Sequence, residues 1–197
     1  VNAELLIDHA WGWEPCTIAD IKRYRPSSKS ISSGQVLKSP YSFSQARLVV
    51  QEMADLLALD LVGRRLVIDQ LVLTVGYDRE NLARPEIRQA YHGAVTADRY
   101  GRAIPKHAHG TANLDRHTSS AQLIANAVLE LYDRIVNKTL TIRRICLSAN
   151  HVLEEDAAAH RPAFEQLDLF TDYSVLSQRC RQQNALLARE RKMQQAV

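Results

Sequence analysis

The sequence lacks the long apolar run that a membrane-spanning helix requires. Such a helix needs about 20 consecutive apolar residues, and the N-terminus carries Glu4 and Asp8 where a secretory signal would carry bases. Cysteine is also scarce. Cys16, Cys146 and Cys180 lie far apart and are odd in number, which argues against a disulfide framework and favours a reducing compartment. We therefore expect a cytoplasmic protein with no membrane partner.

Motifs of catalysis and metal binding are missing as well. No phosphate-binding loop, dinucleotide-binding glycine motif, GxSxG or HExxH occurs. His107 and His109 have no cysteine or carboxylate at ligand spacing, so zinc is not expected. Glu154, Glu155 and Asp156 are consecutive acids without a second acidic cluster, which indicates a solvated surface instead of a magnesium site. We expect no active site, metal or cofactor in this chain.

The balance of charge is mild. The 197 residues are 46% hydrophobic and 24% charged with a net charge of +3, which suits one domain with appendages. The class of partner must therefore be inferred from where the bases lie. A basic, Pro/Ser-rich stretch at residues 22–29 indicates a domain boundary. Because the chain begins at Val1 without a methionine, we expect it to be a piece of a longer protein.

Hydrophobic periodicity predicts an α+β domain with the order βαββαβ. Ser42 with Gln45, and Ser119 with Gln122, form capping-box patterns that start its two amphipathic helices. Right-handed crossovers would place both helices on one face of a single four-stranded sheet and leave the other face open. A short helix ending at Gly12 precedes the domain. The expected strands cover residues 30–38, 66–77, 106–116 and 140–150, the helices 43–62 and 119–137, a long loop 79–105, and a polar C-terminal helix 173–195.

The open face is expected to be polar and basic, and therefore suited to a nucleic-acid backbone. Guanidinium groups bind phosphate bidentately, and small residues let backbone N–H groups approach it. No aromatic residue interrupts the alternation between His107 and Asn113, so stacking of bases on this face is not expected. The alternative is that these bases are ordinary solvated charges. The candidate DNA contacts are Lys29, Ser32, Ser33, Arg102, Lys106, His107, His109, Arg116, Arg143 and Arg144.

A short apolar peptide near the C-terminus has few local partners to pack against. Pro162 blocks helix propagation before it, and the chain becomes polar and basic after it. Burial of its three apolar side chains would contribute roughly 4 to 8 kcal/mol before ordering costs, which predicts an about micromolar docking peptide. The alternative is an edge strand or a helix start that folds onto the domain. The peptide consists of Gln166, Leu167, Asp168, Leu169 and Phe170.

Several stretches together resemble the C-terminal region of Y-family translesion DNA polymerases, in particular the UmuC-like ImpB/MucB/SamB branch. The strand LTIRRICLS at residues 140–148 is similar to the IRRIxV-type last strand of the little finger domain, and KSIS at 29–32 to the start of that domain. QLDLF at 166–170 resembles the QLxLF peptide that holds the sliding clamp. The stretches LLIDHAWGWEP, SSGQVL, DQLVLTVGYD and YGRAIPKHAHGT complete the resemblance, which covers essentially the whole chain.

The resemblance implies three parts. Residues 1–29 are the end of the thumb and a basic linker, 30–153 the little finger DNA-binding domain, and 154–197 a clamp-binding tail with a polar helix. It implies that Arg143 and Arg144 contact phosphates, although some relatives carry a further base at the place of Ser148. The parent would be a DNA-directed DNA polymerase whose magnesium-binding palm precedes Val1, so this part is non-catalytic. It would hold damaged primer–template DNA and the sliding clamp, with other SOS proteins as further candidate partners.

Two other functions remain open from the sequence. The first is a stand-alone adaptor that binds the clamp or another protein and no nucleic acid. The second is a small enzyme that uses His107 or His109, for which no orienting partner is identifiable.

Overall fold

The structure is a computed structural model that describes residues 3–14, 16–24 and 29–159, together with Ala185, Arg189, Lys192 and Met193. These four residues are helical and fall within the expected C-terminal helix. The elements are α1 (Ala3–Ala10), α2 (Ile18–Arg23), β1 (Ile31–Tyr41), α3 (Phe43–Gly63), β2 (Leu66–Tyr77), α4 (Glu80–Ala83), α5 (Pro85–Ala90), β3 (Val95–Ala97), β4 (Ala103–Pro105), β5 (Ala108–Thr118), α6 (Ala121–Ile135), β6 (Ile142–Asn150), β7 (Leu153–Glu154) and α7 (Glu155–Ala159).

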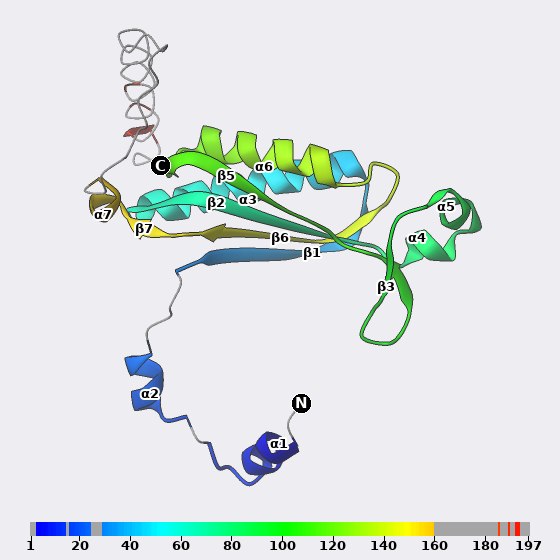
Figure 1. The fold of residues 1–197 in the computed structure, drawn as a ribbon, viewed down its shortest axis with the longest axis horizontal. Coiled ribbons are helices and arrows are strands. Elements are labelled where there is room, and N and C mark those ends of the chain that lie inside the picture. Colours follow the sequence, from blue (N-terminus) through cyan, green and yellow to red (C-terminus); the bar gives the residue numbers. More distant parts are fainter. Residues whose placement is uncertain are drawn as a thin grey trace, which may run out of the picture.

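The main sheet has the strand order β1–β6–β2–β5, and every neighbouring pair is antiparallel. Each helical crossover therefore spans one strand: β6 lies between β1 and β2, and β2 lies between β5 and β6. Helices α3 and α6 lie on the same face of this sheet (Figure 1). The expected α+β fold with the order βαββαβ is confirmed, and the short strand β7 adds a fifth member beside β2.

Side-chain caps start both long helices. The Ser42 side chain accepts from the Gln45 backbone N–H, and the Gln45 side chain accepts from the Ser42 N–H, which is the expected capping box. The prediction for the second helix is wrong by one residue: Ser120 is the N-cap and accepts from Leu123 N–H at 3.3 Å. The reason is that β5 runs on to Thr118, whose Oγ1 accepts from Ser120 N–H at 3.1 Å.

One hydrophobic core fills the space between the sheet and the two helices. Apolar side chains that alternate along the central strands meet the apolar stripes of both helices, and burial of each such side chain stabilises the fold by about 1.5 to 3 kcal/mol. This burial fixes which face of the sheet stays open. The core includes Leu71, Leu73 and Val75 of β2, Ile145 and Leu147 of β6, Val50, Leu57 and Leu61 of α3, and Ile124, Val128 and Leu131 of α6.

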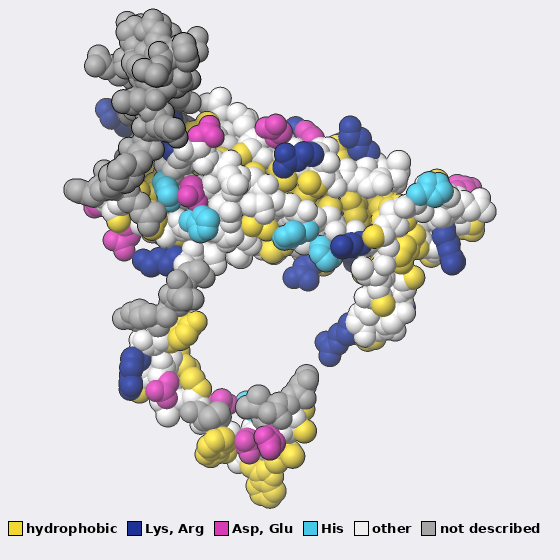
Figure 2. Space-filling view, viewed as in Figure 1, with side chains coloured by type: hydrophobic (Ala, Val, Ile, Leu, Met, Phe, Trp, Pro, Cys, Tyr) yellow, Lys and Arg dark blue, Asp and Glu magenta, His cyan; other side chains and the backbone are white. Residues whose placement is uncertain are grey.

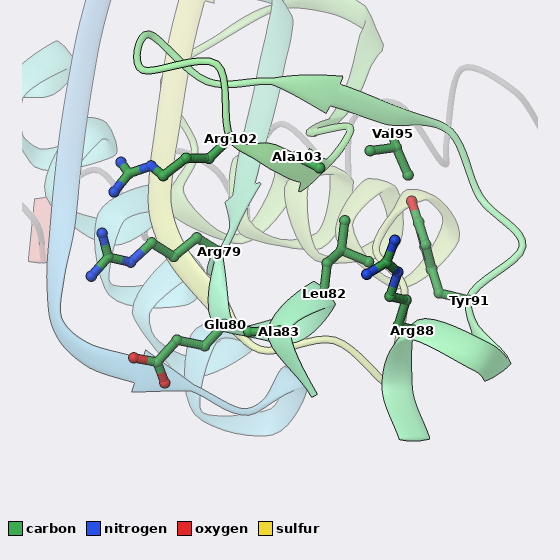
Figure 3. Close-up of a pocket in the computed structure, with 9 residues that line it drawn as sticks. All are labelled: Arg79, Glu80, Leu82, Ala83, Arg88, Tyr91, Val95, Arg102 and Ala103. Carbon is green, nitrogen blue, oxygen red and sulfur yellow. The ribbon is translucent and has the colours of Figure 1, made fainter. Parts of the chain in front are cut away.

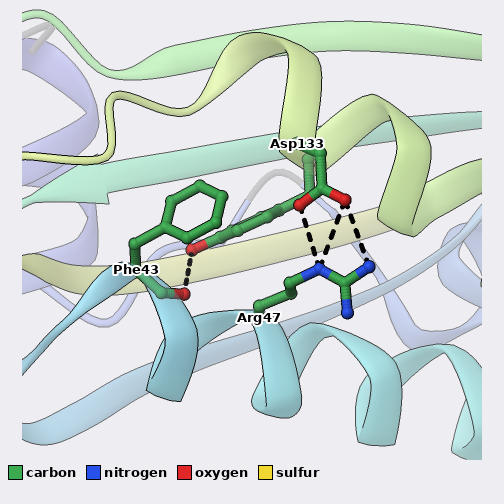
Figure 4. A network of polar contacts seen from close by, with 4 residues as sticks. Phe43, Arg47 and Asp133 are labelled. Carbon is green, nitrogen blue, oxygen red and sulfur yellow. Dashed lines mark hydrogen bonds and ion pairs between the residues drawn. The ribbon is translucent and has the colours of Figure 1, made fainter.

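Polar contacts tie the two helices to each other (Figure 4). The buried Tyr132 donates a hydrogen bond from its hydroxyl to the Phe43 carbonyl at 2.9 Å, and the two rings lie 4.9 Å apart. Burial raises the pKa of Tyr132, so this hydroxyl stays protonated. Beside it, the Arg47 guanidinium donates Nε–H to Asp133 Oδ1 at 2.9 Å and Nη2–H to Oδ2 at 3.1 Å. These contacts fix the register of α3 against α6.

The prediction of a long loop at residues 79–105 is wrong. This segment forms the short helices α4 and α5 and the hairpin β3–β4, which project from one end of the sheet (Figure 1). Asp98 shapes the hairpin turn, because its Oδ1 accepts from the backbone N–H groups of Tyr100 and Arg102 at 2.8 and 3.0 Å. Gly101 has a φ of 75°, which glycine adopts without strain. We call residues 79–105 the insertion.

At the opposite end of the sheet, the chain enters and leaves the domain at one corner. Val152 N–H donates to the Lys29 carbonyl at 3.2 Å, and Lys29 Nζ lies 3.8 Å from Glu154 Oε1. Between β6 and β7, His151 adopts a left-handed φ of 54°, and its Nδ1 lies 2.8 Å from Asp69 Oδ1. The first and last strands of the domain are therefore joined at the corner where both meet the flanking segments.

Candidate nucleic-acid interface

The face of the sheet opposite to α3 and α6 carries short polar side chains that bond to one another. Cross-strand neighbours hold these side chains flat, so the surface is smooth and mostly uncharged. As expected, the face is polar and no described helix covers it (Figure 1), but it carries fewer bases than expected. The hydrogen bonds join Ser32 Oγ to Ser148 Oγ (2.9 Å), Asn150 Nδ2 to Gln70 Oε1 (3.0 Å), Gln70 Nε2 to Asn113 Oδ1 (3.0 Å) and Thr74 Oγ1 to His109 Nδ1 (2.9 Å).

Arg144 is the base that β6 presents on this open face. It is exposed and pairs across the sheet with Gly76 on one side and Val36 on the other. A Cβ at Gly76 would lie 3.4 Å from the Arg144 Cβ, so the glycine keeps the surface low beside the guanidinium. Within the described part of the chain, no acidic side chain bonds to Arg144. Its guanidinium is therefore available to an incoming phosphate.

Arg143 differs from Arg144 in having an acidic neighbour, although both lie between the buried Ile142 and Ile145 on the strand. Gly76 pairs with Arg144 whereas Tyr77 pairs with Ile142, so Arg143 is the extra residue of a β-bulge. Its Nε lies 3.9 Å from Oδ2 of Asp78, whose side chain is only 9% exposed. Arg143 lines a hollow of about 500 Å³ together with three acids, Asp78, Glu80 and Asp98.

Two of the expected contacts, Ser33 and Arg116, fall on the helix-covered side by register. Ser33 pairs with Leu147, whose side chain is in the core. Arg116 is half-buried and follows the alternation of Ala112 and Leu114, which pack against the core. Ser32 does lie on the open face, through its bond to Ser148. Lys29 is exposed at the entry corner, beside Glu154.

Lys106, His107 and Arg102 lie near the end of the sheet that carries the insertion. Lys106 and His107 are exposed between β4 and β5, and the His107 ring meets His109 edge to face at a centroid distance of 6.4 Å. Arg102 starts the second arm of the hairpin. Figure 2 shows the basic side chains spaced along the body and the hairpin, with uncharged surface between them. Arg144 thus lies on the open face itself, whereas Lys106 and His107 lie at one end of it and Lys29 at the other.

A hollow of about 560 Å³ opens between α4, α5 and the hairpin (Figure 3). Arg79 follows β2, Arg102 precedes β4, and the two side chains extend in the same direction, while Arg88 lies beside Tyr91. Arg79 and Arg88 are not among the contacts expected from the sequence. The available signal was a set of three arginines, including Arg84, within eleven residues after a central strand. The remaining lining residues are Glu80, Leu82, Ala83, Val95 and Ala103.

Asn81 fixes the base of this hollow to the sheet. It is 1% exposed, and its Nδ2 donates to the Asp78 and Thr141 carbonyls, both at 2.8 Å. Its Oδ1 accepts from Thr141 N–H at 2.9 Å and from the Thr141 hydroxyl at 3.0 Å. A fully satisfied buried amide of this kind orients the helix that carries it. The insertion is thus anchored where β6 is about to begin.

The charge state of two groups in the insertion follows from their surroundings. The Arg102 guanidinium donates to Asp98 Oδ2 at 2.7 Å and lowers the pKa of Asp98, so the acid stays ionised. Arg102 also lies over the Tyr100 ring at 4.9 Å. Burial raises the pKa of Tyr91, whose neutral hydroxyl donates to the Ala94 carbonyl at 3.0 Å. Arg79 and Arg88 have no acidic partner among the described residues.

The described ranges offer little for other chemistries. Asp69 lies near two histidines, His117 at 3.4 Å and His151 at 2.8 Å, but no group of three or more such residues could hold a metal ion within the described positions. Nor does any described helix combine the length and apolarity needed to cross a bilayer. The docking peptide at residues 166–170 lies outside the described residues.

Comparison with known proteins adds the family. The model of the impB/mucB/samB family C-terminal domain matches residues 28–169. Among solved structures, the chain is similar to one described as a complex of beta-clamp processivity factor and little finger domain of PolIV, with a TM-score of 0.39, 12% identity, and coverage of 73% of this chain and 100% of that chain. No curated protein matches the chain. The chain therefore belongs to the impB/mucB/samB family of Y-family DNA polymerases, of which residues 28–169 are the C-terminal domain.

Proposed function

We propose that this chain is the DNA-holding and clamp-docking part of a lesion-bypass DNA polymerase. The observation that carries the proposal is the polar face of the sheet opposite to α3 and α6. It presents Arg144, which has no acidic partner among the described residues. Lys106, His107 and His109 extend this face toward the insertion. Phosphate contacts of this kind position a duplex without reading its sequence, which suits a template that carries damaged bases.

The catalytic step would belong to another part of the parent enzyme. The palm carboxylates and their magnesium ions, the cytoplasmic location and participation in an SOS response are part of this proposal. All three rest on the family to which the chain belongs. The palm is placed elsewhere because the described residues contain no group of three or more residues that could hold a metal ion. The role proposed for this chain is mechanical: it keeps the primer–template on the enzyme while chemistry proceeds elsewhere.

A fluorescence titration of the full chain with labelled duplexes tests the DNA-binding part. Two duplexes of unrelated sequence should bind with similar affinity, and log K should fall linearly as log salt rises from 50 to 200 mM. Binding that ignores salt, or no binding at all, would refute it. The second result would favour an adaptor that binds protein only.

The clamp-docking part rests on residues 166–170, where Gln166 would be the polar anchor and three apolar side chains would fill a groove on the clamp. Leu167→Ala with Phe170→Ala should abolish retention of the chain by immobilised sliding clamp. Phe164→Ala is the matched control, because it removes an aromatic residue from the same stretch but outside the peptide. DNA titrations should be the same for all three proteins. Retention of the double variant at wild-type levels would exclude this peptide as the clamp contact.

A further inference from the structure

We propose that the hollow between α4, α5 and the β3–β4 hairpin binds the single-stranded DNA that adjoins the duplex. The site is formed by Arg79, Arg88, Tyr91 and Arg102 (Figure 3). This inference rests on the proposed function, in that the duplex lies on the open face of the sheet. It gives a separate role to the insertion, which contributes no strand to the main sheet.

The first argument is charge. Three arginines from separate elements line one hollow with a single acid, Glu80. Arg102 is already paired with Asp98, but Arg79 and Arg88 have no acidic partner within the described ranges. Arg79 and Arg102 extend in parallel, although like charges repel each other (Figure 3). An anion that bridges such guanidinium groups relieves the repulsion, and phosphate matches their donor geometry.

The second argument is the apolar and aromatic remainder of the lining. Leu82, Ala83, Val95 and Ala103 alternate with the arginines, and the Tyr91 ring forms one wall. An acidic peptide or a free phosphate would need the charges alone. A nucleotide needs both, because its phosphate binds arginine while its base packs on an aromatic or apolar surface. By register, the described strands place no phenylalanine, tyrosine or tryptophan on the open face of the sheet.

The third argument is preorganisation. The Tyr91 hydroxyl is tied to the Ala94 carbonyl, and its ring covers Gly93 so closely that a Cβ at Gly93 would lie 2.4 Å from the hydroxyl oxygen. Arg102 is held between Asp98 and the Tyr100 ring. Asn81 anchors the floor of the hollow to the start of β6. The walls are therefore in place before any ligand arrives, which lowers the ordering cost of binding.

The fourth argument is position. Arg79 lies two residues after the end of β2, and Lys106 connects the hairpin to the start of β5. The hollow therefore adjoins the end of the open face where Arg144 lies. Bases inside a duplex are paired and stacked and cannot enter such a hollow, whereas the bases of a single strand that leaves the duplex can.

The test compares three labelled DNAs on the full chain: a blunt duplex, the same duplex with a ten-nucleotide single-stranded tail, and the tail alone. The tail should tighten duplex binding about tenfold, the scale of stacking one base. Arg79→Gln with Arg88→Gln should abolish this gain and leave blunt-duplex affinity within about twofold. Arg64→Gln with Arg134→Gln removes the same charge from exposed positions on and beside the two long helices and should preserve the gain.

Gly93→Ala separates stacking from charge, because it displaces the Tyr91 ring and removes no base. It should reduce the gain severalfold and leave the salt dependence unchanged. An unchanged gain in this variant would overturn the assignment of the hollow to a base. Equal binding of blunt and tailed duplex by the wild type, or a gain that survives the loss of both arginines, would overturn the whole inference.

The two proposals can fail separately. Duplex binding without a gain from the tail keeps the proposed function and overturns the hollow as a single-strand site. If no duplex binds, the proposed function fails and the isolated tail becomes the readout. Tail binding that requires Arg79 and Arg88 then sustains the site, whereas tail binding without that requirement, or none, overturns it.

Discussion

Replacing Arg144 with alanine should weaken DNA binding, whereas the same change at its neighbour Arg143 should not. Arg144 is exposed on the open face without an acidic partner in the described part of the chain, while the bulge directs Arg143 to Asp78 at 3.9 Å. One phosphate contact changes the slope of log K against log salt by about 0.9. Over a tenfold range of salt, that slope corresponds to about an eightfold change in affinity, or about 1.2 kcal/mol.

The assay is fluorescence anisotropy on one labelled duplex between 50 and 200 mM salt. Arg144→Ala should flatten the slope by about 0.9, and Arg144→Lys should restore most of it, because the charge returns without the guanidinium fork. Arg143→Ala should leave the slope within error and lower thermal stability instead, since Asp78 is 7% exposed and loses its cation. Equal flattening by both alanine variants would refute the assignment of the bulge. No effect of Arg144→Ala would refute DNA binding on this face.

Four further substitutions test the fold. Asn81→Ala leaves a buried backbone N–H without an acceptor and should lower the free energy of unfolding in urea by about 2 kcal/mol. The pKa of Tyr132 is raised in the folded protein, so its contribution to the free energy of unfolding is complete below about pH 10, the usual tyrosine pKa, and is lost as the pH rises above it. The free energy of unfolding of Tyr132→Phe should therefore fall less between pH 9 and 11 than that of the wild type. Gly110→Ala places a Cβ 2.9 Å from Leu131 Cδ1 and should lower the free energy of unfolding by about 1 to 3 kcal/mol, whereas Gly63→Ala, with open space around its Cβ, should raise it by about 0.5 kcal/mol. The reverse result, with Gly110→Ala stabilising and Gly63→Ala destabilising, would contradict the packing described.

The long elements could be predicted because their signals are local and repeated. The capping box at Ser42 and the 3.6-residue apolar period after it place α3 to within one residue. The alternation from His109 to Asn113 identifies the open side of β5, and the side-chain bonds of that face confirm it. Such patterns persist over ten or more residues, so an isolated exception does not hide them.

The insertion and the bulge could not be predicted, because neither has a local period. Helix α4 has four residues, and Asn81 gains its partners from Thr141, sixty positions along the chain. The bulge at Arg143 is visible only in the pairing of β6 with β2, since the sequence alone allows both arginines to follow one another on a regular strand. The arginines of the hollow share this difficulty, because they converge from three separate short elements.

The corner at which Lys29 meets Val152 also determines how the domain would respond to tension. Strands β1 and β6 are antiparallel neighbours whose outer ends, Ile31 and Ala149, lie opposite each other beside that corner. A pull applied through the two flanking segments would therefore first separate β7 from β2. It would then peel β1 and β6 apart in series, one backbone hydrogen bond after another, from the Val152 N–H to Lys29 carbonyl bond onward. Antiparallel strands pulled from the same end share no load between their bonds. The domain should open at low force in a single-molecule stretching experiment when held by these two segments.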